Sequence, residues 1–292
     1  MATTIGDFIE QGWNDHVTDL AGVAARLDGA LPLLKREPAK TGDFLALAEH
    51  VLVCHLGDAD AMAGWVERLA PLAVEHPETQ APLARARLAV RLLRGEPVDV
   101  EGQPRVLLIR AHGSATNGAA ARGDFRHARA LLHGARALAG DTDTDSVKAL
   151  AGVANNLASQ MLDNGRGPEP DGLMMEAAEL AQRSWHQAGT WMNAERADYL
   201  LAVCAAAIGD AARAMRHANA CLSLCTAHGA DAYELFFAHE ALGRASLAVG
   251  NRASAHDALA HMRPLLDRID DAGSRAYAQS VFDKVNTTLG EH

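Results

Sequence analysis

Four residues that can bind metals or act as nucleophiles recur at helical spacing late in the chain: His217, Cys221, Cys225 and His228. Their spacing places them on one face of a helix, and all four side-chain types can bind zinc. From His217 to His228 such a helix rises about 16 Å, so one ion could reach only a neighbouring pair. Because a free cysteine also behaves as a small apolar group, we expect this stripe to be structural and assign no metal ligands to it.

A second group of possible ligands lies nearer the N-terminus, at His50, Cys54 and His55. Two imidazoles, or an imidazole and a thiol, could supply part of a metal site. The chain contains 14 histidines, however, and such pairs are expected by chance. Burial or exposure to solvent is therefore the preferred interpretation of these residues.

The run D-T-D-T-D places Asp141, Asp143 and Asp145 at alternate positions, as at the start of a calcium-binding loop. Such a loop needs glycine at its sixth position and glutamate at its last, where this chain has Ser146 and Gly152. Acidic residues also stabilise the positive N-terminal end of a helix. We expect an acidic helix cap here, without calcium.

The common catalytic motifs are absent from the sequence. It contains no phosphate-binding GxxxxGK[ST], no GxGxxG, no GxSxG nucleophile turn and no HExxH. His239-Glu240 begins the last of these motifs, but Gly243 stands where its second histidine is required. We therefore predict no enzymatic activity and no cofactor, and keep a metal-dependent enzyme built on His and Cys as a minor alternative.

Two tryptophans, Trp185 and Trp191, flank an expected turn between helices, with His186 beside the first of them. Aromatic side chains at such corners usually pack neighbouring helix pairs together. A binding patch for an aromatic ligand is the alternative.

The elements that carry these residues are predicted to be helices. Hydrophobic residues make up 49% of the 292 residues but aromatic residues only 4%. Alanine supplies much of the difference, and alanine is the best helix former. The alternation typical of strands is almost absent. The composition therefore indicates an all-α fold.

Charge and targeting signals exclude several classes of protein. The net charge of −10 disfavours nucleic-acid binding, which requires clustered Lys and Arg. The sequence has neither a long apolar run for a membrane span nor a signal peptide at its N-terminus. Its four cysteines include no CxxC pair and do not form a disulfide framework. A cytoplasmic protein with no membrane partner and no nucleic-acid partner is expected.

Glycine-centred turns divide the chain at regular intervals. A left-handed glycine commonly ends a helix, and Asp or Asn commonly begins the next one. The turn glycines are separated by 66, 42, 44 and 41 residues, and the last three intervals form a period. The turns are Gly57-Asp58, Gly123-Asp124, Asn164-Gly165, Gly209-Asp210 and Gly250-Asn251.

Small residues recur around these turns at the places where paired helices must cross. Before Gly250 the sequence reads Leu242-Gly243-x-Ala245, and Ala255 follows the turn. The pattern resembles the tetratricopeptide (TPR) repeat, whose helix pair carries Leu-Gly-x-Ala, then Gly, then Ala at these separations. The resemblance covers about residues 104–268, although a TPR has a period of ~34 residues. A HEAT-type pairing of ~40–47 residues is the alternative. After the residues around Gly250, the next best match to this pattern of small residues is at Gly123, Phe125 and Ala128.

The resemblance implies a right-handed α-α superhelix, a TPR-like solenoid of antiparallel helix pairs. We expect an N-terminal helical segment over 1–96, repeats over 104–270 and a C-terminal capping helix over 271–292, all in one continuous array. The helix expected at 79–94 has no evident partner, so the first segment either pairs irregularly or forms a separate cap. The N-terminal helices are expected near 4–14, 17–33, 41–56, 59–75 and 79–94. The capping helix carries Ala276, Ala278, Val281, Phe282, Val285 and Leu289.

In a TPR array the first helix of each pair lines the concave face, where ligands usually bind. Asparagine can hold the backbone of an extended peptide, and arginine can bind a carboxylate in bidentate fashion. Counting back from the turn glycines selects the candidate binding residues. They are Arg110, Asn117, Asn155, Asn156, Ser159, Arg196, Tyr199, Phe237, Glu240 and Arg244.

Three of these residues, Asn117, Asn156 and Arg196, match positions at which TPR domains of the carboxylate-clamp type hold a peptide C-terminus. Gly113 and Leu200 stand at two further clamp positions where a cationic residue is expected, so a more general peptide or small-acid groove is preferred. Interhelical hydrogen bonding or simple exposure of these side chains is the structural alternative.

The sequence thus predicts a non-enzymatic interaction module, an adaptor or scaffold that binds a peptide or protein segment. A regulatory protein that senses a small molecule or signalling peptide is the second alternative, and the metal-dependent enzyme is the third. Alanine-rich solenoid faces can also pair, and a twofold homodimer is a further expectation.

Overall fold

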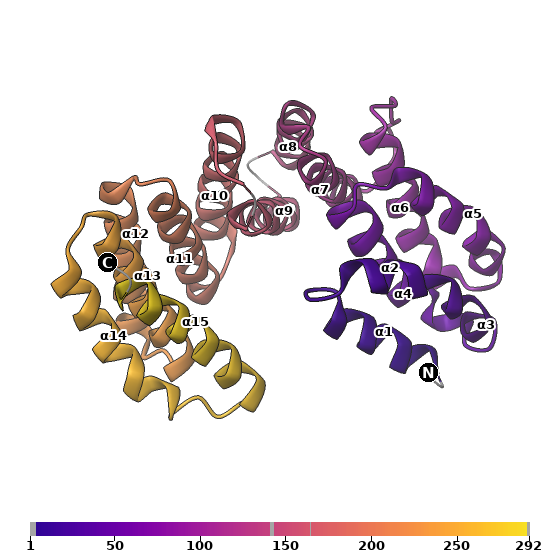
Figure 1. Ribbon diagram of the computed structural model, residues 1–292. Helices are drawn as coiled ribbons and strands as arrows, with labels where there is room; N and C mark the ends of the chain where they lie inside the picture. The colour runs from indigo at the N-terminus through magenta and orange to yellow at the C-terminus, as the bar shows by residue number, and fades with distance from the viewer. Residues whose placement is uncertain (1–3, 141–142, 164, 291–292) are drawn as a thin grey trace. The chain divides into compact units, whose positions relative to one another are not determined.

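The computed structural model describes residues 4–140, 143–163 and 165–290, and every regular element in these ranges is helical (Figure 1). This confirms the all-α prediction. By contact the chain divides into two compact units, Met1–Val153 and Ala154–His292, with the division falling inside α9. The helices of the first unit are α1 Ile5–Asp15, α2 Leu20–Arg26, α3 Leu31–Leu34, α4 Thr41–Ala48, α5 Ala59–Glu75, α6 Gln80–Leu93, α7 Arg105–Ala121 and α8 Phe125–Ala139. Those that follow are α9 Thr144–Leu162, α10 Pro168–Ala188, α11 Trp191–Ala207, α12 Ala211–His228, α13 Ala232–Ala248, α14 Arg252–Leu266 and α15 Ala272–Gly290.

The turn glycines end helices as predicted. Gly57, Gly123, Gly209 and Gly250 have φ values of +62°, +75°, +78° and +74°, a conformation that costs glycine little and other residues much. In each turn the next residue accepts a hydrogen bond from a backbone N–H of the following helix, which satisfies a donor that the helix leaves open. These N-caps are Asp58, Asp124, Asp210 and Asn251. Asn164, of the remaining turn, lies outside the described residues.

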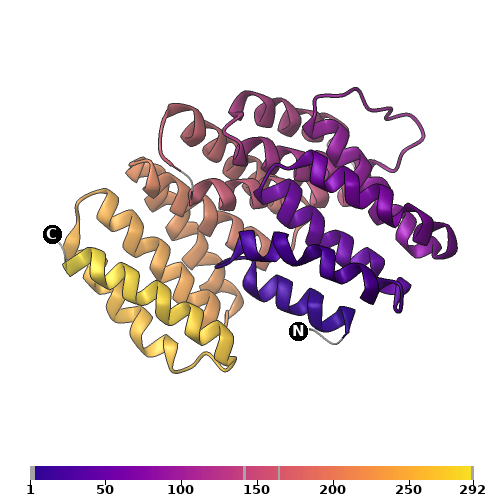
Figure 2. The same ribbon diagram turned by 45° about the vertical axis from the view of Figure 1, so that its right-hand side comes forward.

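The second unit consists of helices that pack on their neighbours in the chain. α11 packs on α12, and α13 packs on α14 (Figure 2). The first helices of these pairs, α11 and α13, also contact each other, and α13 contacts α15. At the α13–α14 crossing a Cβ built on Gly243 would lie 3.6 Å from the Cβ of Ala258. The small-residue frame therefore marks the crossing, although Ala258 rather than the equally buried Ala255 faces the glycine.

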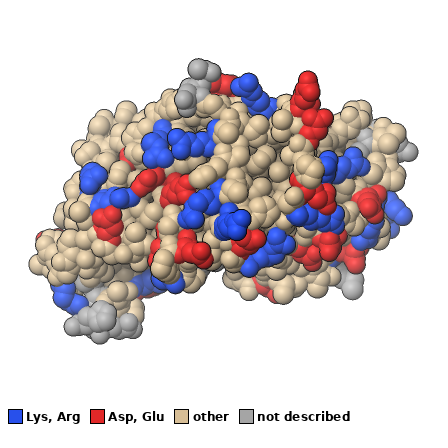
Figure 3. All heavy atoms as spheres, turned by 90° about the horizontal axis from the view of Figure 1, so that it is seen from above, with Lys and Arg blue, Asp and Glu red and all other residues tan. Residues whose placement is uncertain are grey.

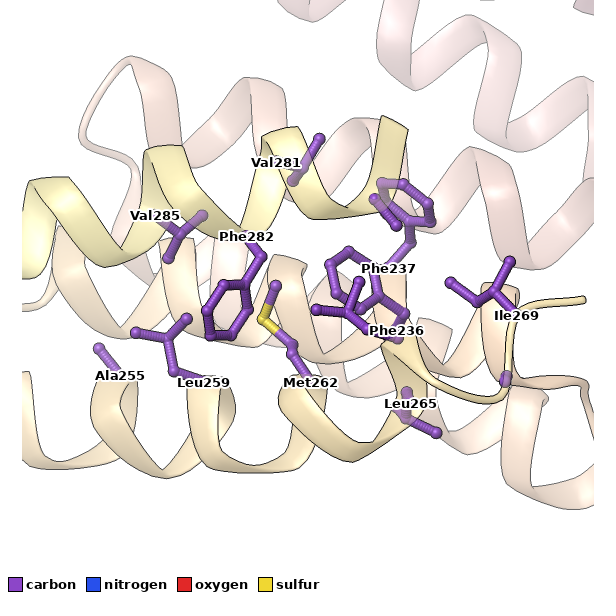
Figure 4. Packing of buried hydrophobic residues seen from close by; sticks show 13 residues of the cluster. Phe236, Phe237, Ala255, Leu259, Met262, Leu265, Ile269, Val281, Phe282 and Val285 are labelled. Carbon is purple, nitrogen blue, oxygen red and sulfur yellow. The ribbon is translucent and has the colours of Figure 1, made fainter. Parts of the chain in front are cut away.

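The C-terminal helix α15 closes the apolar core of the second unit. Phe282 projects from α15 towards Met262 of α14, and Phe236 of α13 lies beside them (Figure 4). Met262 and Phe236 have no exposed surface and Phe282 has 4%. Burying a side chain of this size stabilises the fold by roughly 1.5–3 kcal/mol. Four of the residues predicted for a capping helix are buried in this core, namely Ala278, Val281, Phe282 and Val285, whereas Ala276 is exposed and the side chain of Leu289 lies outside the described residues. The capping role itself stays a prediction.

The N-terminal helices match the sequence prediction in place but not in continuity. The segment predicted as a helix over 17–33 is broken into α2, a 3-10 turn and α3. The segment predicted over 41–56 begins as α4 and continues from Glu49 to His55 as a π-helix. α6, the helix for which the sequence suggested no partner, contacts both α5 and α7. The loop at 97–104 joins α6 to α7 inside the first unit.

Two glycines allow neighbouring helices to pack closely against the π-helix and α4. A Cβ on Gly118 of α7 would overlap the carbonyl oxygen of Val53, so only glycine lets α7 approach the π-helix this closely. Likewise a Cβ on Gly12 of α1 would overlap the side chain of Leu47 on α4. None of the described helices is long and apolar enough to cross a membrane.

Candidate functional site

Four buried carboxylates lie on α11 and α13, the first helices of the pairs α11–α12 and α13–α14, which also contact each other. Glu195 and Asp198 of α11 are each 1% exposed, and Glu234 and Glu240 of α13 are 4% and 0% exposed. An unpaired charge is costly to bury, so each carboxylate needs a partner or a proton. The residues that pair with these carboxylates make the main polar contacts of the second unit.

Glu234 binds the guanidinium of Arg196 across the α11–α13 contact. The Nε of Arg196 donates to both oxygens of Glu234, at 3.1 and 3.2 Å, and its Nη2 adds a further bond. The hydrogen bond from Arg196 to Glu234 raises the pKa of the guanidinium. Asp231 caps α13, because it accepts from the N–H groups of Tyr233 and Glu234. The side chain of Glu234 binds Arg196 and does not reach back to the backbone of Asp231, so the two residues form no capping box.

A second arginine is anchored in the same way further along α13. Arg244 donates through its Nε to the fully buried Glu240. Tyr199 of α11 lies beside this pair, and burial, followed by the charge of Glu240, raises the pKa of the tyrosine. Glu240 is thus a support beneath the surface, whereas Arg244 keeps 39% of its side chain exposed.

Aromatic rings connect the two anchored arginines. Phe237 of α13 is the centre of the group, with its ring centroid 5.6 Å from Tyr199, 4.8 Å from Tyr233 and 5.8 Å from Tyr277 of α15. Tyr277 is 57% exposed, and Tyr199 and Tyr233 are half-buried. We name the surface formed by Arg196, Tyr199, Tyr233, Arg244 and Tyr277 the tyrosine–arginine surface.

The stripe at 217–228 lies on α12, and each of its residues has its own surroundings. His217 Nδ1 lies 2.7 Å from one oxygen of Asp198, and His186 Nε2 lies 2.7 Å from the other. His228 stacks on Trp191, with ring centroids 4.7 Å apart. The four residues therefore do not converge on one ion, in agreement with the geometric argument from the sequence. The remaining members, Cys221 and Cys225, are fully buried.

Cys221 donates to Glu195 at a distance of 2.9 Å, and Cys225 lies close enough for the three to offer ligand atoms within 4.8 Å. Burial raises the pKa of Glu195 to about 7. The hydrogen bond to Cys225 and burial raise the pKa of the Cys221 thiol far above its usual range. Without a metal, these three side chains form a hydrogen-bonded carboxyl–thiol cluster.

The remaining predicted binding residues are placed on α7 and α9. Asn117 of α7 is buried with 9% exposure, so it lies beneath the surface, while Arg110 is exposed. On α9, Asn156 and Ser159 are exposed and Asn155 is half-buried. Arg110 and Asn117 belong to the first compact unit, and the α9 residues to the second. A groove shared by all the predicted residues stays a prediction.

Two smaller predictions can be compared with the structure. Asp143 accepts hydrogen bonds from the N–H of Asp145 and the hydroxyl of Ser146 at the start of α9, as expected of an acidic helix cap. Asp141 lies outside the described residues. In the first unit, the rings of His50 and His55 meet a third histidine, His16, that no pattern in the sequence connects with them.

A polar pocket is lined by residues of α10, α11 and α12. Its walls include Gln182, Arg213, Arg216 and His217. Arg213 is already bound by Glu179 and Asp210.

On the face drawn in Figure 3, Lys and Arg side chains lie next to Asp and Glu side chains, and neither sign forms a continuous patch.

No protein-family model matches the chain, and no curated protein does. The site is therefore assigned from its own geometry. Sequence reasoning found Arg196, Tyr199 and Arg244 but missed the buried carboxylates Glu195 and Glu234. For Glu195 the available signal was an acidic residue in the alanine-rich segment 194–207, at a position that an amphipathic helix would fill with an apolar side chain.

Proposed function

We propose that the chain is a TPR-like, cytoplasmic interaction module that binds a protein segment on the tyrosine–arginine surface. One observation carries the proposal. Two arginines, Arg196 and Arg244, are fixed by buried carboxylates on either side of a group of partly exposed tyrosines. Tyr and Arg are the residue types that most often dominate binding energy in protein interfaces.

The anchoring contacts leave each arginine able to bind a ligand. A guanidinium has five N–H donors, and those bound to Glu234 use only part of the donors of Arg196. Its orientation is already fixed, so less conformational entropy is lost on binding. Because Glu234 and Glu240 balance the two positive charges, the surface favours backbone carbonyl oxygens and aromatic or aliphatic side chains over a strongly acidic ligand.

The arrangement of the helices supports the TPR-like assignment. α11 and α13 are the first helices of successive pairs, and α15 follows them against α13. In a TPR-like array such helices line the binding face. The interval of 41 residues between Gly209 and Gly250 exceeds the ~34 of a TPR, because these helices are longer. A scaffold without catalytic residues is consistent with this surface.

The test begins with a random-peptide library displayed on phage and selected against the purified full-length chain. Fluorescence anisotropy then gives the affinity of an enriched peptide for the native chain and for the double variant Arg196→Gln/Tyr277→Ala. Arg213→Gln is the matched control, because Arg213 also binds a glutamate, Glu179, but lies on α12 outside the surface. Circular dichroism establishes that each variant is folded.

The proposal predicts that the double variant weakens peptide binding by at least about tenfold, the scale of an interface hot spot. The control is expected to bind as the native chain does. If no peptide is enriched, or if the double variant binds unchanged, the proposal is wrong. Stabilisation of the chain by a metabolite in the absence of peptide binding would instead favour the ligand-sensing alternative.

A further inference from the structure

Three imidazoles converge in the first unit, from α1 and from the π-helix Glu49–His55. The Nε2 atoms of His50 and His55 are 3.0 Å apart. The ring centroids of His16 lie 4.9 Å from those of His50 and 5.9 Å from those of His55. One nitrogen of each ring lies within 4.8 Å of the other two. All three residues are half-buried.

These separations are close to those of ligands around one metal ion. Two histidine nitrogens bound to tetrahedral zinc at 2.0–2.1 Å lie about 3.3 Å apart. The His50–His55 pair is already near this spacing, and one nitrogen of His16 lies within 4.8 Å of both. Imidazole nitrogen is a preferred ligand of zinc and of the neighbouring divalent transition metals.

The π-helix is what brings His50 and His55 together. An α-helix turns about 100° per residue, so residues five apart would point about 140° away from each other. A π-helix closes its hydrogen bonds between residues five apart and so brings such residues to the same side of the helix. The N–H of Leu56 accordingly donates to the carbonyl of Val51, at 3.1 Å. Short π-helical segments are frequent at functional sites.

The third ring is oriented in the way that metal-bound histidines usually are. His16 Nδ1 lies 2.6 Å from the carbonyl oxygen of Trp13 and donates to it, which leaves Nε2 as the nitrogen with a free lone pair. A backbone carbonyl is a common partner for the second nitrogen of a metal ligand. The Trp13 ring packs 5.0 Å from His50 and covers one side of the group.

We propose that His16, His50 and His55 form a three-histidine site for a divalent transition metal, zinc in particular. The three nitrogens leave one position of a tetrahedral ion for water or for a ligand from another molecule, the arrangement of an open zinc site. This site is independent of the tyrosine–arginine surface. Burial and the neighbouring histidines also lower the pKa of His50 to about 4, which keeps its ring neutral, as ligation requires.

The experiment uses tag-free full-length chain, zinc in a chelator-buffered solution and Co²⁺ as a spectroscopic probe. The variants are His16→Gln and His55→Gln, each affecting a different element. The control is His239→Gln, since His239 stacks on His261 with ring centroids 4.8 Å apart and, among the described residues, this pair belongs to no group of three possible ligands. Circular dichroism and thermal unfolding are measured on all proteins without metal.

The proposal predicts one zinc per chain and a Co²⁺ absorption spectrum typical of tetrahedral coordination. Each of the two variants removes a ligand and should weaken zinc binding by more than the roughly tenfold that loss of a residue supporting a ligand already costs, while the control leaves it unchanged. Zinc should also raise the melting temperature of the native chain but not of His16→Gln. Absence of stoichiometric zinc, or equal zinc affinity in the native chain and both folded variants, would overturn it.

Discussion

The guanidinium of Arg196 on α11 closes over the carboxylate of Glu234 on α13, a residue 38 positions further along the chain. The side chain of Glu234 is 6% exposed and that of Arg196 is 55% exposed. A carboxylate below the surface thus fixes an arginine that solvent and ligands can reach. The same arrangement recurs with Glu240 and Arg244, and it links the stability of the second unit to its proposed binding surface.

Removing the arginine is expected to cost more stability than removing the charge of its partner. Arg196→Ala leaves the carboxylate of Glu234 without its cation and should lower the free energy of unfolding by about 1–3 kcal/mol. Glu234→Gln removes the buried charge and should cost less, and the double variant should cost less than the sum. Urea unfolding of the four proteins measures this coupling. Strictly additive effects would show that the two side chains do not interact in solution.

The stability of the second unit should fall as the pH rises, because Glu195 is protonated in the folded chain and loses this proton at higher pH. Burial raises the pKa of this carboxyl from 4.5 to about 7, so between these values the folded chain binds a proton that the unfolded chain has lost. Its contribution is full below pH 4.5 and is lost as the pH rises through 7. Glu234, Cys221 and Cys225 face the same group.

Denaturant unfolding from pH 5 to pH 8 tests this behaviour in the native chain and in Glu195→Gln. The glutamine variant should lack the loss of stability between pH 5 and pH 7 that Glu195 causes. Glu179→Gln, which changes a half-exposed residue of α10, is the control and should follow the native profile. A Glu195→Gln profile parallel to the native one would show that Glu195 titrates near its ordinary pKa.

Two glycine-to-alanine changes in the first unit should have opposite effects. Gly118→Ala places a methyl group against the carbonyl of Val53 and should destabilise the fold by about 1–3 kcal/mol. Gly64→Ala, inside α5 with nothing within 4 Å of the added carbon, should stabilise it by about 0.5–1 kcal/mol. Thermal unfolding of both variants gives the signs. Equal effects at the two positions would contradict the close approach of α7 to the π-helix.

The capping helix should depend strongly on one aromatic residue. Phe282→Ala removes a ring packed against Met262 and should lower stability by about 3–5 kcal/mol. Tyr277→Ala, on the exposed side of the same helix, should cost much less. Hydrogen exchange of α15 separates local detachment of the helix from global unfolding. A similar loss of stability in both variants would mean that the packing of Phe282 in this core does not stabilise α15.

The helices were predictable because their ends depend on local chemistry. Gly209 with Asp210, and Gly250 with Asn251, mark turns through conformational and capping preferences that act within a few residues. The π-helix at Glu49–His55 was missed because an apolar helical segment has the same composition whether it is α or π. The packing of α6 on α7 was also missed, since the spacing of the turn glycines does not show which helices pack together across a loop.

The site was predictable only in part for a related reason. Counting from the turns located Arg196, Tyr199 and Arg244 on successive helices, because repeat position determines which face a residue occupies. The anchoring role of Glu234 depends on a helix 38 residues away, so no local pattern in the sequence indicates it. His16 joins His50 and His55 through tertiary packing alone.

The most direct test of the proposed function is photo-crosslinking with an enriched peptide that carries a benzophenone side chain, followed by mass spectrometric mapping. The account predicts crosslinks to α11, α13 and α15 around Arg196, Tyr233 and Tyr277, and their loss when unlabelled peptide competes. Competed crosslinks confined to the first unit, or to the pocket around Arg213, would contradict it.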